Sequence, residues 1–295
     1  MKHNILTAFA VISMIFVAAA CTVIPEDERI TSGPVSFGTK SVLLVEFTGW
    51  KCVNCPDAAK VAHQLLELHG DNLVVVGIHP DGASWCIPTG AALDLRTEVG
   101  GKYWSYFGSP VSFPVGVIDF YPFKGDYLLD RDLWAPSVAK RRTLYQDIFL
   151  VPTIELNGRT LDIQTRLFTM EDTVSTKDLS MIVWITEDNI VGLQLEGSEP
   201  NPQYVHNHVL RAAATPEWGE DVDAPAGGAP TFHHANITLD ESWMINNCNV
   251  VAILIDKATK EVLSVRQVPV VNTSAGEGGE EGGEEGGEGD IIDII

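Results

Sequence analysis

Residues 42–56 read VLLVEFTGWKCVNCP, and this stretch decides the fold of the first half of the chain. The apolar run at 42–47 has the length of a β-strand that is covered on both faces. Cys52 and Cys55 follow a short turn, and Pro56 suits the first turn of a helix, where its missing N–H is not needed. Unpaired N–H groups and the dipole at a helix N-terminus lower the pKa of a thiol. The pattern therefore predicts thiol–disulfide chemistry, with Cys52 as the attacking sulfur and Cys55 as the resolving one.

Three interpretations of this cysteine pair remain open. The first is a redox-active dithiol, which requires that the sulfur of Cys52 be reachable from a groove that admits a polypeptide. The second is a permanent structural disulfide, since a compartment outside the cytoplasm supplies no reductant by itself. The third is a zinc site, which is disfavoured because tetrahedral sites need four ligands and the sequence has no second Cys-x-x-Cys.

The sequence around the pair predicts a βαβ unit. An apolar face at helical spacing runs from Ala58 to Leu68, Gly70 ends the helix, and 73–78 is a second buried strand. A helical insertion is expected at 81–109, followed by a strand that Pro114 opens and a last helix within 131–146. Residues 41–148 therefore form a predicted α/β domain.

Beyond this domain the hydrophobic period changes. Short segments of alternating or β-branched residues, one of them a continuous strand at 205–214, alternate with turn signals such as Asn157-Gly158. They predict an all-β antiparallel sandwich over 149–271. A long Gly/Pro-rich loop, 215–230, carries Trp218.

The first domain resembles the thioredoxin fold in its order of parts: strand, Cys-x-x-Cys at a helix N-terminus, strand, and a Phe113-Pro114 pair that opens a later strand. In that family the proline is cis and presents a strand edge to substrate peptides, so the resemblance implies this role for Pro114. Glu46 lies six residues before Cys52, where thioredoxins carry a buried acid that exchanges protons with the resolving thiol. A solvated strand-end carboxylate is the alternative for Glu46.

The histidines form a second constellation. Within the predicted strand at 205–214, His206 and His208 are expected on one face, and His233 and His234 lie on another strand. Together they are candidate ligands for a transition metal. Because alternating histidines on a solvated β face are common, we assign no metal site. Motifs for hydrolases or nucleotide binding are absent, so no cofactor is expected.

The N-terminus predicts export and lipidation. Residues 1–20 have a basic start, an apolar run and small residues before Cys21, which resembles the lipobox of bacterial lipoproteins. An ordinary cleaved signal or an uncleaved anchor are the alternatives. Residues 21–40 are a predicted tether. In the oxidising envelope, Cys86 and Cys248 either bridge the two domains or stay as lone buried thiols.

The formal net charge is −21, and residues 272–295 form a Gly/Glu-rich tail that cannot bury a core and is expected to be disordered. Acidity of this kind argues against nucleic-acid binding, which needs basic patches.

Several separated segments resemble the twenty-eight-kilodalton outer-membrane lipoprotein family: 48–56, 204–211, 217–219 and 247–252. The resemblance implies an outer-membrane, lipid-anchored protein that faces the periplasm or the cell surface. We expect thiol–disulfide exchange with extracytoplasmic protein thiols or disulfides, the activity of a thioredoxin-like oxidoreductase. The alternative is a non-enzymatic surface-binding or adhesion lipoprotein with a structural Cys52–Cys55 disulfide, whose working surface would be the β domain and the loop around Trp218.

Overall fold

A nine-stranded sheet joins the two predicted domains in this computed structural model, which describes residues 39–170 and 177–270. All of these residues belong to one compact unit, Ser32–Ile295. The strand order is β14-β13-β7-β10-β2-β1-β4, with the short strands β3 and β11 paired to β2 and β7. β1 and β2 are parallel, whereas β7, β13 and β14 pair antiparallel. The fold is therefore mixed α/β, and its sheet is continuous across the predicted boundary near residue 148.

The elements have the following bounds. The helices are α1 (Cys55–His69), α2 (Glu98–Tyr106) and α3 (Trp134–Arg142). The strands of the first part are β1 (Val42–Phe47), β2 (Leu73–Pro80), β3 (Arg96–Thr97) and β4 (Val115–Ile118). The later strands are β5 (Ile148–Asn157), β6 (Thr160–Thr169), β7 (Leu179–Glu187), β8 (Ile190–Glu196), β9 (Glu199–His206), β10 (Val209–Ala213), β11 (Glu220–Val222), β12 (Thr231–Thr238), β13 (Cys248–Asp256) and β14 (Val262–Pro269).

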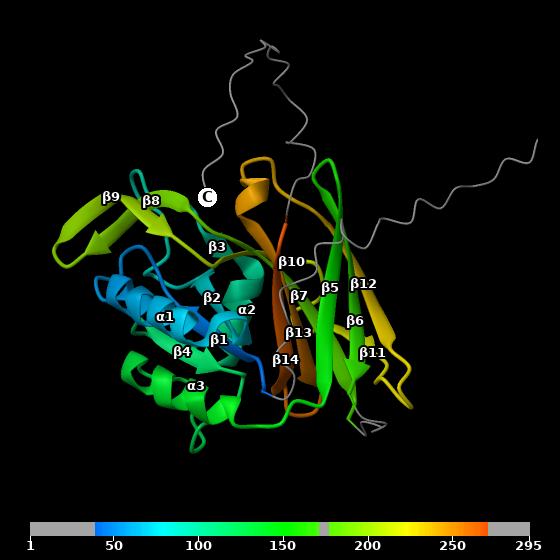
Figure 1. The fold of residues 1–295 in the computed structure, drawn as a ribbon. Coiled ribbons are helices and arrows are strands. Elements are labelled where there is room, and N and C mark those ends of the chain that lie inside the picture. The colour runs from blue at the N-terminus through cyan, green and yellow to red at the C-terminus, as the bar shows by residue number, and fades with distance from the viewer. Residues whose placement is uncertain (1–38, 171–176, 271–295) are drawn as a thin grey trace, which may run out of the picture. The chain divides into compact units, whose positions relative to one another are not determined.

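The two faces of the long sheet are covered differently. On one face, alternate residues of β1, β2, β7 and β13 share a single core with Tyr103 of α2 and with Phe107, which follows this helix. On the opposite face, α1 and α3 cover β1 and β2 through residues such as Leu65 and Trp134. The three-stranded sheet β12-β6-β5 packs on the same side against β7, β13 and β14. Figure 1 shows α1 and α3 at one end of the long sheet and this second sheet at the other.

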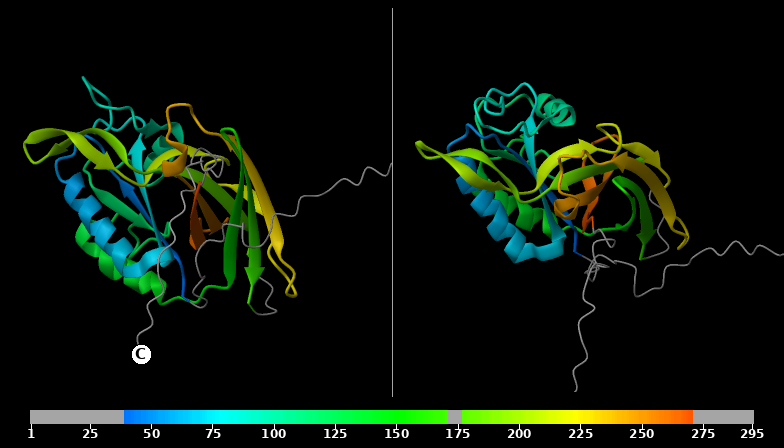
Figure 2. Two further views of the ribbon diagram at one scale, coloured as in Figure 1. Left: turned by 45° about the horizontal axis from the view of Figure 1, so that its top comes forward. Right: turned by 90° about the horizontal axis from the view of Figure 1, so that it is seen from above.

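A hairpin formed by β8 and β9 stands apart from both sheets. Its two strands pair only with each other among the described residues. It leaves the long sheet after β7 and returns to it at β10, and it extends beside α1 in each ribbon view (Figure 2).

Two predicted elements differ from the structure. Within the insertion at 81–109 only α2 is helical, because the Thr97 hydroxyl accepts a hydrogen bond from the backbone N–H of Gly100 and starts the helix there. The continuous strand predicted at 205–214 is wrong. His208 has φ of 57°, and this positive value breaks the segment into β9 and β10.

Candidate functional site

A disulfide joins Cys52 and Cys55 where β1 leads into α1. The turn between these elements is closed by hydrogen bonds from the Cys52 N–H to the Gly49 carbonyl (3.0 Å) and from the Cys55 N–H to the Cys52 carbonyl (3.3 Å). Cys55 is the first residue of α1, with Pro56 in the first turn. The predicted position of the pair at a helix N-terminus is therefore confirmed.

Both sulfur-bearing residues are buried. Cys52 is 3% exposed and Cys55 is 2% exposed. The sequence interpretation needed a Cys52 that a visiting polypeptide can reach, and in this conformation that requirement is not met. Local sequence could not reveal this, because the residues that bury the pair come from a distant part of the chain.

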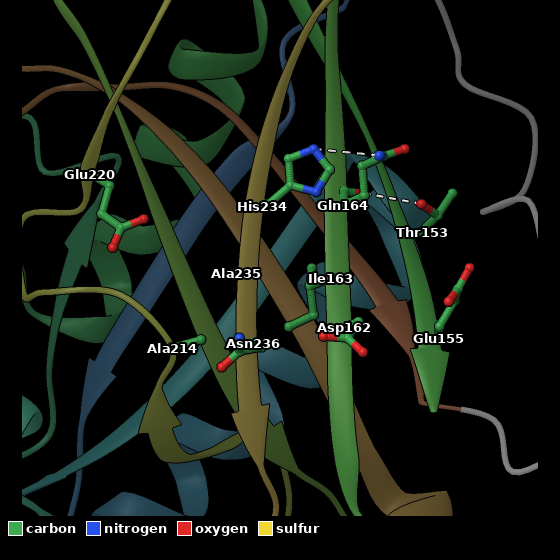
Figure 3. A pocket seen from close by; sticks show the side chains of 10 residues that line it. All are labelled: Thr153, Glu155, Asp162, Ile163, Gln164, Ala214, Glu220, His234, Ala235 and Asn236. Atoms are coloured by element: carbon green, nitrogen blue, oxygen red, sulfur yellow. Dashed lines mark hydrogen bonds between the residues drawn. The ribbon is translucent and has the colours of Figure 1, made fainter. Parts of the chain in front are cut away.

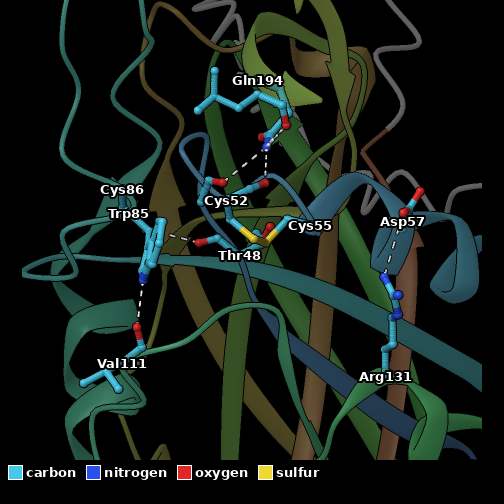
Figure 4. The surroundings of a disulfide bond; sticks show 11 residues. Thr48, Cys52, Cys55, Asp57, Trp85, Cys86, Val111, Arg131 and Gln194 are labelled. Carbon is cyan, nitrogen blue, oxygen red and sulfur yellow. Dashed lines mark hydrogen bonds and ion pairs between the residues drawn. A yellow bond between two sulfur atoms is a disulfide. The ribbon is translucent and has the colours of Figure 1, made fainter. Parts of the chain in front are cut away.

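Gln194 of β8 lies against the loop that carries Cys52 (Figure 4). Its side-chain amide Nε2 donates to the carbonyl oxygen of Cys52 at 3.0 Å and lies 3.4 Å from that of Gly49. The backbone N–H of the next residue, Leu195, donates to the carbonyl of Trp50 at 2.8 Å. The hairpin β8–β9 is thus hydrogen-bonded to the loop that carries Cys52.

A cavity of about 120 Å³ lies beside Cys55, between α1, β2 and the β8–β9 hairpin. Its lining includes Glu46 of β1, His79 of β2, and Tyr204 and His206 of β9. Glu46 Oε1 and both ring nitrogens of His79 are buried there without a hydrogen-bond partner. Orphaned buried polar atoms next to a space of this size are typical of a site that holds ordered water or a small polar ligand.

Burial controls the charge of these groups. It raises the pKa of Glu46 to about 8, so this carboxyl is mostly protonated at neutral pH. Burial, followed by the neighbouring His206, lowers the pKa of His79 to about 3, and burial lowers that of His206 to about 4. The two rings meet edge to face with centroids 5.9 Å apart. Glu46, His79 and His206 are therefore mostly neutral at pH 7, and the alternative of a solvated Glu46 is wrong.

Pro114 lies at the end of β1 from which the Cys52 loop departs. The Phe113–Pro114 peptide bond is cis and immediately precedes β4. β4 pairs antiparallel with β1, and this register sets Val115 opposite Phe47. The ring of Phe113 stacks on Phe47 at 6.5 Å.

The structure does not bring the four candidate metal ligands together. His206 and His208 both line the cavity, but the His206 ring meets that of His79 and the His208 ring pairs with Asp188 at 3.0 Å. His233 is buried and pairs with Glu220 at 2.9 Å. Among the residues that the structure describes, no three His, Cys, Asp or Glu side chains are arranged to hold a metal ion. The expectation that His206 and His208 share one strand face fails because β9 ends at His206 and His208 has a positive φ.

His234 points to the other face of β12 from His233. It lines a polar hollow of about 480 Å³ over β5, β6 and β12, and its ring lies 3.5 Å from Gln164 (Figure 3). This hollow contains no second histidine.

Cys86 and Cys248 are both free and buried, so of the two alternatives the lone buried thiols are confirmed and the bridge is not formed. They belong to different hydrophobic cores, on opposite faces of the long sheet. Burial raises the pKa of each thiol to about 12. The Cys86 Sγ contacts the carbonyl oxygen of Thr48 at 3.1 Å, next to the Cys52 loop.

The loop around Trp218 is not a free surface. The indole packs against the rings of Tyr103, Tyr106 and Phe120 at centroid distances of 5.2, 4.5 and 5.8 Å. The Tyr103 hydroxyl also donates to the backbone carbonyl of Glu217. This part of the loop covers the core instead of presenting Trp218 to a partner.

Cys21, the predicted signal, most of the tether and the acidic tail lie outside the described residues. No helix within residues 39–170 and 177–270 is long and apolar enough to cross a membrane.

These features define a class: a mixed α/β protein with a covered Cys-x-x-Cys disulfide at a helix N-terminus. A family model described as outer membrane protein Omp28 matches residues 112–274, more than half of the chain. The chain therefore belongs to the Omp28 family of outer membrane proteins. The matched range includes Pro114 and the whole β-rich part, and it begins after the cysteine pair.

Solved structures resemble the fold at low sequence identity. HBP35 of Porphyromonas gingivalis gives a TM-score of 0.63 at 14% identity, covering 80% of this chain and 76% of that chain. A domain of the outer membrane lipoprotein Omp28 from Porphyromonas gingivalis gives a TM-score of 0.32 at 19% identity, covering 42% of this chain and 88% of that chain. No curated protein matches the sequence.

Proposed function

We propose that this chain is an envelope lipoprotein whose thioredoxin-like half carries a thiol–disulfide exchange centre, Cys52–Cys55. The observation that carries the proposal is the cavity shared by Cys55 and the unpartnered carboxyl of Glu46. A buried carboxyl without a partner destabilises a fold, so its presence beside a Cys-x-x-Cys favours a role in chemistry.

The topology supports the thioredoxin-like assignment. β1 leads to the cysteine pair and α1, β2 returns parallel to β1, and β4 follows a cis proline and pairs antiparallel with β1. For the second half we propose a sandwich, in which the sheet β12-β6-β5 is one layer and β7, β13 and β14 form the other.

Each exchange step balances between four sulfurs. In the reducing direction, the Cys52 thiolate attacks a disulfide of an extracytoplasmic protein, and one substrate thiolate leaves. The ionised form of Glu46, a minority at neutral pH because its pKa is about 8, accepts the proton of Cys55, and the Cys55 thiolate then attacks the Cys52 sulfur of the mixed disulfide. The second substrate thiolate leaves, the substrate has gained two electrons, and the Cys52–Cys55 bond has formed. A protein dithiol then reduces the Cys52–Cys55 disulfide and returns the centre to its starting state. In the oxidising direction, a protein disulfide accepts the two electrons instead.

A second candidate rests on the burial of the pair. Cysteines that are almost unexposed suit a structural crosslink in a non-enzymatic binding or adhesion lipoprotein. The packing of Trp218 against neighbouring rings removes one part of the surface that the sequence indicated for such binding, so exchange is the first candidate.

Location and anchoring complete the proposal. Family membership supports the outer membrane, and the lipobox-like segment supports acylation of Cys21 after removal of residues 1–20. The lipid on Cys21 would anchor the protein to the membrane. The folded unit would then face either the periplasm or the cell surface.

Trapping of mixed disulfides tests the exchange function. In cells that produce the Cys55→Ala variant, Cys52 should hold captured proteins in bonds that dithiothreitol releases. The Cys52→Ala/Cys55→Ala double variant is the matched control and should capture none.

The redox potential gives an independent result. Titration against glutathione buffers should give a value above about −270 mV for an exchange centre. A value below about −300 mV, together with no captured protein, would establish the structural disulfide instead.

A further inference from the structure

We propose that the β8–β9 hairpin is a built-in cover that occupies the place of an extended protein substrate at the Cys52 loop, and that exchange requires its displacement. The substrate class rests on the proposed function, whereas the covering contacts stand without it.

One main-chain hydrogen bond and one side-chain amide join the hairpin to the loop that carries Cys52. The Leu195 N–H donates to the Trp50 carbonyl at 2.8 Å, a main-chain contact two residues before Cys52. Extended peptides that add to a protein edge use the same kind of bond. The Gln194 amide adds the contact to the Cys52 carbonyl at 3.0 Å. An arriving chain cannot pair with these carbonyls while the hairpin holds them.

The hairpin depends on these contacts. A two-stranded hairpin is marginally stable by itself, and this one joins neither larger sheet among the described residues. Its β9 strand contains Pro200 and Pro202, which cannot donate to a further strand. Its inner face is buried at Gly192, Gln194 and His206, while most other positions are half-buried or exposed.

The base of the hairpin is held more firmly than its body. Asn189 and His208 have φ of 59° and 57°, and the Asn189 N–H donates to Asn207 Oδ1 at 2.9 Å. The His208 N–H donates to Asp188 Oδ1 at 2.6 Å. Displacement is therefore expected as a bend beyond this base, which frees Gln194 and Leu195 together and leaves the strands β7 and β10 in place.

The test measures access to the disulfide. The full chain is purified in detergent in its oxidised form, treated with dithiothreitol, and labelled with a thiol reagent over time. Gln194→Ala removes the amide contacts, and reduction of Cys52–Cys55 should become roughly 5- to 100-fold faster than in the parent chain. Gln203→Ala is the matched control, because Gln203 is exposed on the same hairpin and should leave the rate unchanged.

A second variant addresses the main-chain bond. Leu195→Pro removes the N–H that Trp50 accepts, at a position whose N–H points away from β9. It should accelerate reduction in the same direction, and circular dichroism reports whether each variant is folded. Equal rates for all three variants and the parent, or an equal increase for both glutamine variants, would overturn the proposal.

The two proposals fail separately. Faster reduction of Gln194→Ala with no protein captured by Cys55→Ala would reject exchange and retain the cover. Captured proteins together with an unchanged reduction rate would retain exchange and reject the cover.

Discussion

Arg141 of α3 donates its Nε hydrogen to Asp119 Oδ2 at 2.7 Å, and neither side chain is more than 4% exposed. The other carboxylate oxygen of Asp119 accepts the backbone N–H of Leu43 at 2.9 Å. Arg141 also reaches Glu261, just before β14, at 2.7 Å. This buried ion pair therefore joins β1 and α3 to the last hairpin of the chain.

Removal of the negative charge should destabilise the fold strongly. In Asp119→Asn the buried Arg141 keeps only Glu261, and the buried Lys40, 3.0 Å from Asp119, loses its carboxylate, so the free energy of unfolding should fall by about 3–5 kcal/mol. Asparagine tolerates the φ of 52° at this position, so the backbone is not the cause of the loss. Urea unfolding measures the effect, with the exposed Asp132→Asn as control. A loss below about 1 kcal/mol would contradict a structural role for the pair.

Glu46 should make the oxidised protein less stable as the pH rises. The pKa of Glu46 is about 8 in the folded protein and 4.5 for a free side chain. Its contribution to the free energy of unfolding is therefore complete below pH 4.5 and is lost as the pH rises through 8. Between pH 6.5 and 8 the loss should be about 1.5 kcal/mol. Urea unfolding of Glu46→Gln should show that part of the pH dependence removed. Glu241→Gln, at an exposed position, should retain it.

His79 should make the protein less stable as the pH falls. Its pKa is about 3 in the folded protein and 6.5 for a free side chain. Its contribution to the free energy of unfolding is therefore complete above pH 6.5 and is lost as the pH falls toward 3. From pH 7 to pH 5 the loss should be about 2 kcal/mol. Unfolding of His79→Asn at both pH values should show a smaller decrease than in the parent chain. An equal decrease would mean that His79 is solvated. The control is His63→Asn, at an exposed position of α1, which should keep the decrease seen in the parent chain.

Gly116 should not tolerate a side chain. A Cβ at this position in β4 would lie 2.3 Å from Nε1 of Trp134, whose indole donates to the Leu129 carbonyl at 3.0 Å. Gly116→Ala should lower stability by about 1–3 kcal/mol through overpacking. Gly77→Ala is the matched control, since its Cβ would meet its nearest atoms at 3.7 Å. Thermal unfolding distinguishes them, and equal melting temperatures would show that Trp134 can move aside.

Local patterns identified most of the elements but not their neighbours. The apolar run at 42–47, Pro56 and Gly70 predicted β1 and α1 because strand and helix periodicity are properties of consecutive residues. The strand predicted across 205–214 is wrong because a contact between residues distant in sequence interrupts it. The positive φ at His208 is held by Asp188, a contact made only when β7 and β10 pair.

For the site, consecutive residues alone specified a Cys-x-x-Cys at the start of a helix, because capping and proline preferences act within one turn. Tertiary packing alone decided that this pair is buried beneath a distant segment, since Gln194 lies 142 residues beyond Cys52. It also decided that Cys86 and Cys248 stay apart, because the turn that carries Cys86 and the strand β13 that carries Cys248 place them in cores on opposite faces of one sheet. Burial by distant segments, and not any local motif, sets the charge of Glu46 and His79 beside the sulfur atoms.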